Sequence, residues 1–227
     1  CRTQIDEYGA ILTRNPEELL EVFTLLTWVV EALREADWIP SQAHMDVLER
    51  IAPTLRHLRH GDGSLARFHG GGKGIEGRLD GALAKSGNKR LSANRLAMGF
   101  GRLSQCRTTI VMDVAPPPSG RASLNAHAST LALELTSGRS PIVVNSGPGS
   151  RFGADWAYVG RMGPAHSTLT IEGASNAQFG RLRVPSTRKS ESLIEGPNQV
   201  PFEFSESKSV HQIEAGHNGF VSTTGLT

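Results

Sequence analysis

The sequence predicts an α+β protein in which a helical part, residues 1–92, precedes an antiparallel β-sandwich, residues 93–227. Apolar residues recur at helical spacing near the N-terminus, whereas from Arg107 onward they alternate with polar ones. Glycine and proline separate the short alternating segments, a pattern typical of antiparallel sandwiches. The two parts are therefore expected to be distinct domains of different secondary structure.

Composition narrows the class of protein. The chain has 227 residues, 38% of them hydrophobic and 20% charged, as in globular domains. Its net charge of +2 argues against a dedicated nucleic-acid binder but permits a local basic groove for an anionic sugar. No apolar run is long enough to span a bilayer. Cys1 and Cys106 lack metal-ligand spacing and are too few for a disulfide framework.

The first helix is predicted to begin after Asn15, which has the residue type of an N-cap. Pro16 suits the first helical position, and Glu18 is placed to complete a capping box. The helix is expected to end near Ala36. Its apolar face consists of Leu19, Val22, Phe23, Leu26, Val29, Val30 and Leu33.

A second helix is predicted after the Trp38-Ile39-Pro40 break, with Ser41 as its cap. Pro53 should kink it and Gly61 is a candidate left-handed stop. Its apolar face consists of Met45, Leu48, Ile51, Ala52, Leu55 and Leu58. Two helices joined by a short loop form an antiparallel pair, which needs further structure to cover its apolar surface.

Residues 70–102 read as a linker or cover, and the first clear strand is residues 108–114. A β-hairpin follows at residues 125–147. Alternating leucines from Leu131 to Leu135 give its first strand one apolar and one polar face, Ser137-Gly138 suits the turn, and residues 142–144 are β-branched. The hairpin can carry polar groups to one end of a sheet.

The remaining sequence predicts a long glycine-rich loop at 148–163 that could line a cleft, and strands at 167–171, 200–204 and 210–213. A basic run is a solvated loop or a track for an anionic glycan. It comprises Arg181, Arg183, Arg188 and Lys189. His44, His57, His60 and His69 lack metal spacing and read as surface or core-edge residues.

Four runs together resemble the heparinase II/III-like polysaccharide lyases. They are Ala126-His127-Ala128, Leu131-Ala132-Leu133-Glu134-Leu135, Val144-Asn145-Ser146-Gly147 and Ala165-His166-Ser167-Thr168-Leu169. The resemblance implies that residues 1–92 are the end of an incomplete α/α toroid and that the sandwich follows it. It also implies a piece of a longer periplasmic or cell-envelope protein.

Lyases of this kind cleave a uronate glycosidic bond by β-elimination. The uronate carboxylate must be neutralised, a base removes the adjacent C5 proton, and an acid, often a tyrosine, protonates the leaving oxygen. The resemblance places a metal held by His, Asp and His beneath the sandwich part of the site. It therefore implies an anionic polysaccharide as substrate and zinc as a possible cofactor.

The resemblance assigns His127, Asn145 and His166 to the metal positions. Asn145 stands where the family usually has aspartate, and a neutral amide is a poor zinc ligand. A hydrogen-bonded polar cluster without metal therefore stays open as the alternative.

Asn125 occupies the position of the histidine that acts on substrate, and an amide can bind a carboxylate but cannot transfer a proton. Tyr158 is the candidate acid, with loop anchoring as its alternative. Arg151 and Arg161 could pair with a uronate carboxylate, or could simply be solvated. Because of these substitutions, a non-catalytic glycan-binding or envelope-associated homologue is the second hypothesis, and a purely structural module the third.

Overall fold

The computed structural model describes residues 4–89, 95–172, 174–181, 191–221 and 225. The α-helices are α1 (Pro16–Glu35), α2 (Gln42–His57), α3 (Arg78–Ser86) and α4 (Ala154–Val159), and the 3-10 turns are η1 (Gly120–Asn125), η2 (Gly149–Phe152) and η3 (Gly163–Ala165). The strands are β1 (Leu96–Ala97), β2 (Phe100–Gln105), β3 (Thr108–Asp113), β4 (Leu133–Ser137), β5 (Ser140–Val143), β6 (Gln178–Arg181), β7 (Glu191–Glu195), β8 (Phe202–Glu206) and β9 (His211–Ala215).

The predicted start of α1 is confirmed. Asn15 Oδ1 accepts hydrogen bonds from the backbone N–H groups of Glu17 and Glu18, at 3.0 and 3.1 Å, and so satisfies two free donors of the first turn. The Glu18 carboxylate accepts instead from the Thr13 hydroxyl at 2.8 Å. Only half of the expected capping box therefore forms.

The helix α2 is confirmed, with Pro53 inside it, but Ser41 makes no side-chain cap. Gly61 is not a left-handed stop, because α2 is capped at Leu58 with φ of −88°. Gly61 is needed for close approach instead. A Cβ at this position would lie 2.1 Å from the carbonyl oxygen of Gly138, so the loop after α2 touches the hairpin turn backbone to backbone.

The prediction that residues 70–102 are only a linker or cover was wrong. This stretch contains α3 and the strands β1 and β2. Gly77 and Gly87 bracket α3 in left-handed conformations, and Leu79 and Leu83 pack into the main core. Two turns of helix are too short for periodicity to distinguish from a loop.

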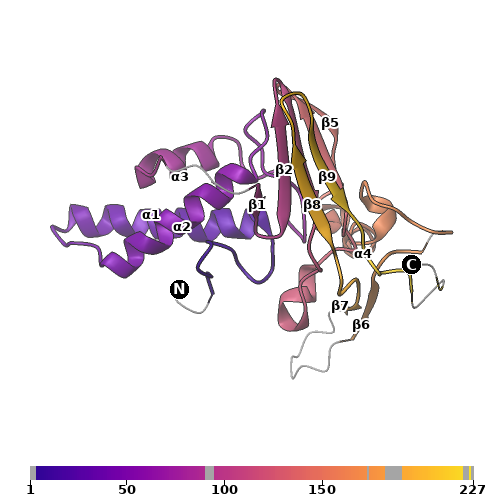
Figure 1. Ribbon diagram of the computed structural model, residues 1–227. Coiled ribbons are helices and arrows are strands. Elements are labelled where there is room, and N and C mark those ends of the chain that lie inside the picture. Colours follow the sequence, from indigo (N-terminus) through magenta and orange to yellow (C-terminus); the bar gives the residue numbers. More distant parts are fainter. Residues whose placement is uncertain (1–3, 90–94, 173, 182–190, 222–224, 226–227) are drawn as a thin grey trace.

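Five antiparallel strands form one sheet in the order β1-β2-β3-β4-β5. Phe100 points to the helices, where its ring lies 4.6 Å from that of Phe68. The adjacent Gly101 faces the β8–β9 ribbon, and a Cβ there would meet Ile213 and Phe204 at 3.0 and 3.2 Å. Figure 1 shows the resulting layers, with α1–α3 on one side of β2 and the ribbon on the other.

The predicted hairpin forms as β4 and β5, with Gly138 at φ of 59° in the turn. Its faces are not used as the leucines suggested. Ala132, Glu134 and Thr136 are buried, whereas Leu133 and Leu135 are only half-buried. The polar face is turned toward the helical part because partners for Glu134 lie there.

The later strands were predicted in part. The expected strands at 200–204 and 210–213 correspond to β8 and β9, whereas 167–171 holds only an isolated bridge between Ile171 and Ala174. The ribbon β6–β7 was not predicted. In the expected glycine-rich loop 148–163, η2, α4 and η3 form instead of an irregular loop. Arg181 ends β6, and the rest of the basic run lies outside the described residues.

One main hydrophobic core joins the helices to the sheet. It contains Leu19, Phe23 and Ile51 from the helices together with Phe100 and Val111 from the strands. This core therefore crosses the predicted domain boundary at 92–93. The division of the chain into two domains at that point stays a prediction. Within the described residues, no helix combines the length and apolar character needed to cross a bilayer.

Candidate functional site

A groove of about 470 Å³ collects most of the predicted catalytic and substrate-binding residues. Its walls include Asn125 at the end of η1, His127, Tyr158 of α4 and Arg161. Glu191, the first residue of β7, closes another side. Segments distant in sequence thus contribute polar side chains to one cavity, as is usual for a binding site.

The predicted metal residues lie together just behind this groove. The rings of His127 and His166 have centroids 4.9 Å apart. Asn145 Oδ1 accepts a hydrogen bond from the backbone N–H of Ser167 at 3.2 Å, which holds the amide beside the His166 segment. All three side chains are buried. The structure therefore brings together the three residues that the resemblance had assigned to one cluster.

The two histidines of this cluster are neutral. Burial lowers the pKa of His166 to about 4, and the nearby His69 adds to the shift. The pKa of His127 falls well below its usual value, mainly through burial and then through His166. Within the described part of the chain, no hydrogen-bond partner of good geometry is present for His127 Nδ1, for either ring nitrogen of His166 or for Asn145 Nδ2. The cluster is therefore polar and buried, with ring nitrogens that accept no hydrogen bond from the described residues.

A chain of polar groups that ends in a buried ion pair fixes the backbone of His127. Its N–H donates to His69 Nδ1 at 3.3 Å, and His69 Nε2 lies 3.3 Å from Asp113 Oδ2. Asp113 in turn forms an ion pair with Arg14, whose Nη2 lies 2.5 Å from Asp113 Oδ1. Burial alone would raise the pKa of Asp113, but Arg14 and His69 outweigh it, so the pKa is lowered and the carboxylate stays charged.

A second buried carboxylate, Glu134, fixes Asn145. Glu134 Oε1 accepts from the Asn145 N–H at 2.9 Å, and Oε2 lies 2.8 Å from His60 Nε2 and accepts from the Arg67 N–H at 3.2 Å. The Arg67 guanidinium is 3.6 Å away. Glu134 of β4 therefore links the segment after α2 to the segment after β5 that carries Asn145.

The reading of the helix-side histidines as surface or core-edge residues was wrong for three of them. His57, His60 and His69 are all buried. His57 Nε2 lies 2.9 Å from the Phe100 carbonyl oxygen, while His60 and His69 face Glu134 and Asp113. Their partners are distant in the sequence, so spacing could not reveal them. The available signal was an acidic residue inside each of two predicted strands, Glu134 and Asp113.

Asn125 and Tyr158 face the groove with solvent access. Asn125 is exposed at the end of η1, directly against Gly70, where a Cβ would lie 3.0 Å from that of Asn125. Tyr158 is 38% exposed, and its ring packs edge-on against Phe179 with centroids 5.8 Å apart. Both side chains can contact a ligand, and Tyr158 is also held by packing.

Arg161 and Arg151 differ in their contacts and in their position relative to the groove. Arg161 donates to the carbonyl oxygens of Ala126, Glu191 and Ser123, and its guanidinium lies 4.7 Å above the ring of Phe179. It therefore holds the wall of the groove together, and a substrate-binding role stays a prediction. Arg151 is exposed in η2, next to the groove but not in its wall.

The donor set fits a metal only in part. Neutral imidazoles with free ring nitrogens, as in His127 and His166, are suitable zinc ligands. Asn145 supplies no negative charge, and its oxygen already accepts from Ser167. Among the described residues, no group of three or more His, Cys, Asp or Glu side chains could hold a metal ion. Zinc binding therefore stays a prediction.

These features define a sheet-based protein with a polar groove at one end. Residues 88–227 match the sequence model of the family described as heparinase II/III-like, C-terminal. This match covers more than half of the chain. The protein is a member of the heparinase II/III-like family.

Two solved structures have the same fold over most of this chain. The chain superposes on a solved heparinase III with a TM-score of 0.65 and 10% identity, over 94% of this chain and 35% of that one. For heparan sulfate lyase HepC from Pedobacter heparinus, the TM-score is 0.57 and the identity 14%, over 81% of this chain and 34% of that one. At this identity the likeness concerns the fold alone.

A curated relative has a different description. The chain is 28% identical over 169 residues to FtsZ-localized protein C from Caulobacter vibrioides, which is 74% of this chain and 29% of the relative. The chain thus spans about a third or less of the length of the proteins it matches.

Proposed function

We propose that this chain forms part of a polysaccharide lyase that cleaves an anionic, uronate-containing polysaccharide by β-elimination. The observation that carries the proposal is the groove in which Asn125, His127 and Tyr158 meet. The family and the fold of the two heparinase structures support it. Incubating the full-length protein with heparin, heparan, chondroitin or alginate should release the 4,5-unsaturated uronate. The absorbance of this product measures the reaction. Silence on every polymer would count against a lyase.

The groove residues can divide the work as follows. The Asn125 amide can donate a hydrogen bond to the uronate carboxylate, which favours loss of the adjacent proton. The Tyr158 hydroxyl can protonate the leaving oxygen. The buried His127 is neutral and cannot supply positive charge to the carboxylate. Groups that complete the reaction would come from the remaining length of the protein.

Replacing Tyr158 by phenylalanine should lower kcat by roughly 100-fold or more, since the transferred proton is lost, while KM changes little. The edge-on packing against Phe179 is kept in this variant. Tyr8→Phe is the matched control because Tyr8 is 71% exposed and lies outside the groove. If Tyr158→Phe retained full activity, Tyr158 would be only an anchor for α4.

We further propose that His127 and His166 can hold zinc, with Asn145 as a weak third ligand. Zinc bound there would supply positive charge beneath the groove. Asn145→Asp restores a charged ligand and should raise zinc affinity at least about tenfold, measured by calorimetry and by metal content after dialysis. Equal affinity in both proteins, or retention of zinc after His166→Ala, would contradict this site.

The helical part is proposed to be the end of an α/α toroid that faces a β-sandwich. On α1, Leu25, Trp28 and Val29 remain 58%, 49% and 45% exposed. An apolar helix face of this kind is normally covered by further helices. Limited proteolysis of the full-length protein, with α1 resistant to cleavage, would support this arrangement.

The second candidate function is a non-catalytic glycan-binding or envelope-associated homologue. It is favoured by the amide at Asn125, which cannot transfer a proton, and by the relative that is described through its localisation rather than a reaction. Binding of a uronate polymer without turnover would separate it from the lyase. A periplasmic or envelope location is part of both proposals and can be checked by cell fractionation.

A further inference from the structure

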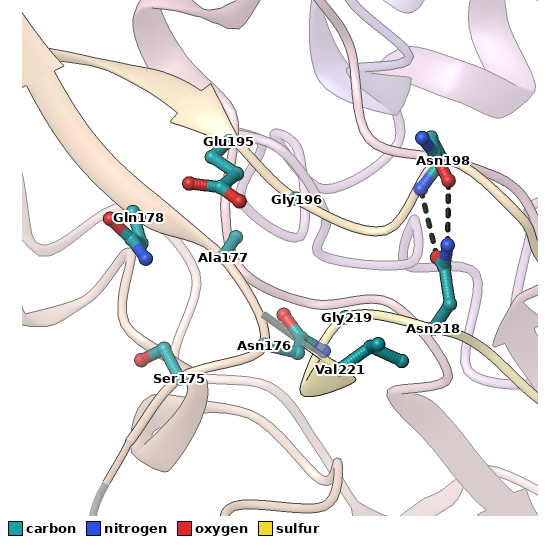
Figure 2. A pocket seen from close by; sticks show the side chains of 10 residues that line it. All are labelled: Ser175, Asn176, Ala177, Gln178, Glu195, Gly196, Asn198, Asn218, Gly219 and Val221. Atoms are coloured by element: carbon teal, nitrogen blue, oxygen red, sulfur yellow. Dashed lines mark hydrogen bonds between the residues drawn. The ribbon is translucent and has the colours of Figure 1, made fainter. Parts of the chain in front are cut away.

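A second pocket, of about 290 Å³, lies at the end of the β6–β7 ribbon away from the groove. Glu191 at the start of β7 borders the groove, whereas Glu195 at its end borders this pocket. Gln178 of β6 pairs with Glu195, and Asn218 enters from the loop after β9. Figure 2 shows Gln178, Glu195 and Asn218 around one space.

Carboxamides dominate the polar lining of the pocket. Asn176, Gln178, Asn198 and Asn218 contribute amides and Glu195 a carboxylate. Within the described residues, the wall contains no cationic side chain and no aromatic ring. Carboxamides both donate and accept hydrogen bonds, as sugar hydroxyls do. Among the described lining residues Glu195 is the one charged side chain, and its carboxylate disfavours an anionic ligand.

Asn176 is held in a fixed orientation beneath the exposed amides. Its side chain is fully buried, and Nδ2 donates to the Thr130 carbonyl oxygen at 3.1 Å. This bond fixes the orientation of the amide, and among the residues that the structure describes none donates a hydrogen bond to Oδ1. A buried acceptor without a donor is unfavourable. Because Oδ1 is itself buried, a ligand in the pocket would contact the exposed amides of Gln178 and Asn198 rather than this atom.

The walls are already formed without a ligand. Asn218 Oδ1 accepts from the N–H groups of Asn198 and Gln199, and Asn218 Nδ2 donates to Asn198 Oδ1 at 2.7 Å. Figure 2 shows this paired arrangement. Gly219 packs against Asn176 so closely that a Cβ would lie 2.7 Å from its carbonyl oxygen. Little ordering entropy is therefore left to lose on binding.

We propose that this pocket binds a neutral, hydroxyl-rich saccharide unit, in addition to any ligand of the groove. Glu195 accepts from sugar hydroxyls, and Asn198 Nδ2 and Gln178 donate to them. The site does not depend on lyase activity, because none of the lining side chains belongs to the groove.

Saturation-transfer NMR on the full-length protein tests this, with chitobiose and maltose as neutral probes and glucuronic acid as the anionic probe. At least one neutral probe should bind. The double variant Gln178→Ala, Asn198→Ala should weaken it at least about tenfold, since two hydrogen bonds are removed. Gln212→Ala, an exposed glutamine of β9 outside the pocket, should leave binding unchanged.

Glu195→Gln adds a test of charge. It should keep neutral binding within about twofold and should improve binding of glucuronic acid, since the repelling carboxylate is gone. The unfolding temperature of each variant checks that it is folded. Absence of binding by both neutral probes, binding that survives the double variant, or binding of glucuronic acid alone would overturn the proposal, whether or not the protein is a lyase.

Discussion

Replacing Glu134 by alanine is expected to lower the free energy of unfolding by about 3–5 kcal/mol, the range for breaking a buried charge pair. The carboxylate is 1% exposed and serves three donors, His60, the Arg67 N–H and the Asn145 N–H. Its loss leaves these groups buried without an acceptor. Denaturant unfolding of the full-length protein and the Glu134→Ala variant measures the difference.

The matched control is Glu203→Ala, which removes an exposed glutamate from another strand, β8. Surface substitutions of this kind stay within about 0.5 kcal/mol. If Glu134→Ala and Glu203→Ala destabilised the protein equally, the carboxylate would not hold the hairpin to the helical part. The zinc and groove proposals would then also lose the support that positions Asn145.

Acidification is expected to destabilise the protein between pH 6.5 and about 4. Burial lowers the pKa of His57 and of His166 to about 4 in the folded state, against 6.5 in the unfolded chain. The unfolded state therefore binds more protons in this window, so stability is complete above the window and is lost as the pH falls through it. Between pH 7 and pH 5 the loss is about 2 kcal/mol for each of the two histidines.

The measurement is the free energy of unfolding across this range, with His57→Gln as the test variant. Glutamine cannot titrate but can still donate to the Phe100 carbonyl oxygen, as His57 Nε2 does. The loss between pH 7 and pH 5 should be smaller by about 2 kcal/mol in the variant. The lowered pKa of Asp113 affects the free energy of unfolding only at pH values below this range, so Asp113 does not contribute to the loss between pH 7 and pH 5. Equal losses in both proteins would show that His57 is protonated without cost.

The sequence predicted those features that depend on neighbouring residues. The Asn15 cap of α1 and the Gly138 turn formed as expected because both are decided by local backbone geometry and nearby hydrogen bonds. The family motifs also identified His127, Asn145 and His166, which the structure places together. Their chemical roles stay predictions.

Local reasoning failed where an element depends on distant contacts. The strand expected at residues 167–171 has alternating residues but pairs only through one bridge, while β2 gained its place by pairing with β3 and packing Phe100 against the helices. Strand formation depends on the neighbour that supplies hydrogen bonds. A single sequence does not say which neighbour that is.

By itself the sequence determined where α1, α2 and the hairpin turn lie, the family, and which side chains are available for chemistry. Only the tertiary structure decided which face of β4 is buried and which charges meet. Glu134 turns inward because His60 and Arg67 reach it from the helical side. Asp113 turns inward because Arg14 and His69 reach it in the same way. A buried carboxylate is tolerated only when donors and opposite charges surround it, and these come from parts of the chain that meet only on folding.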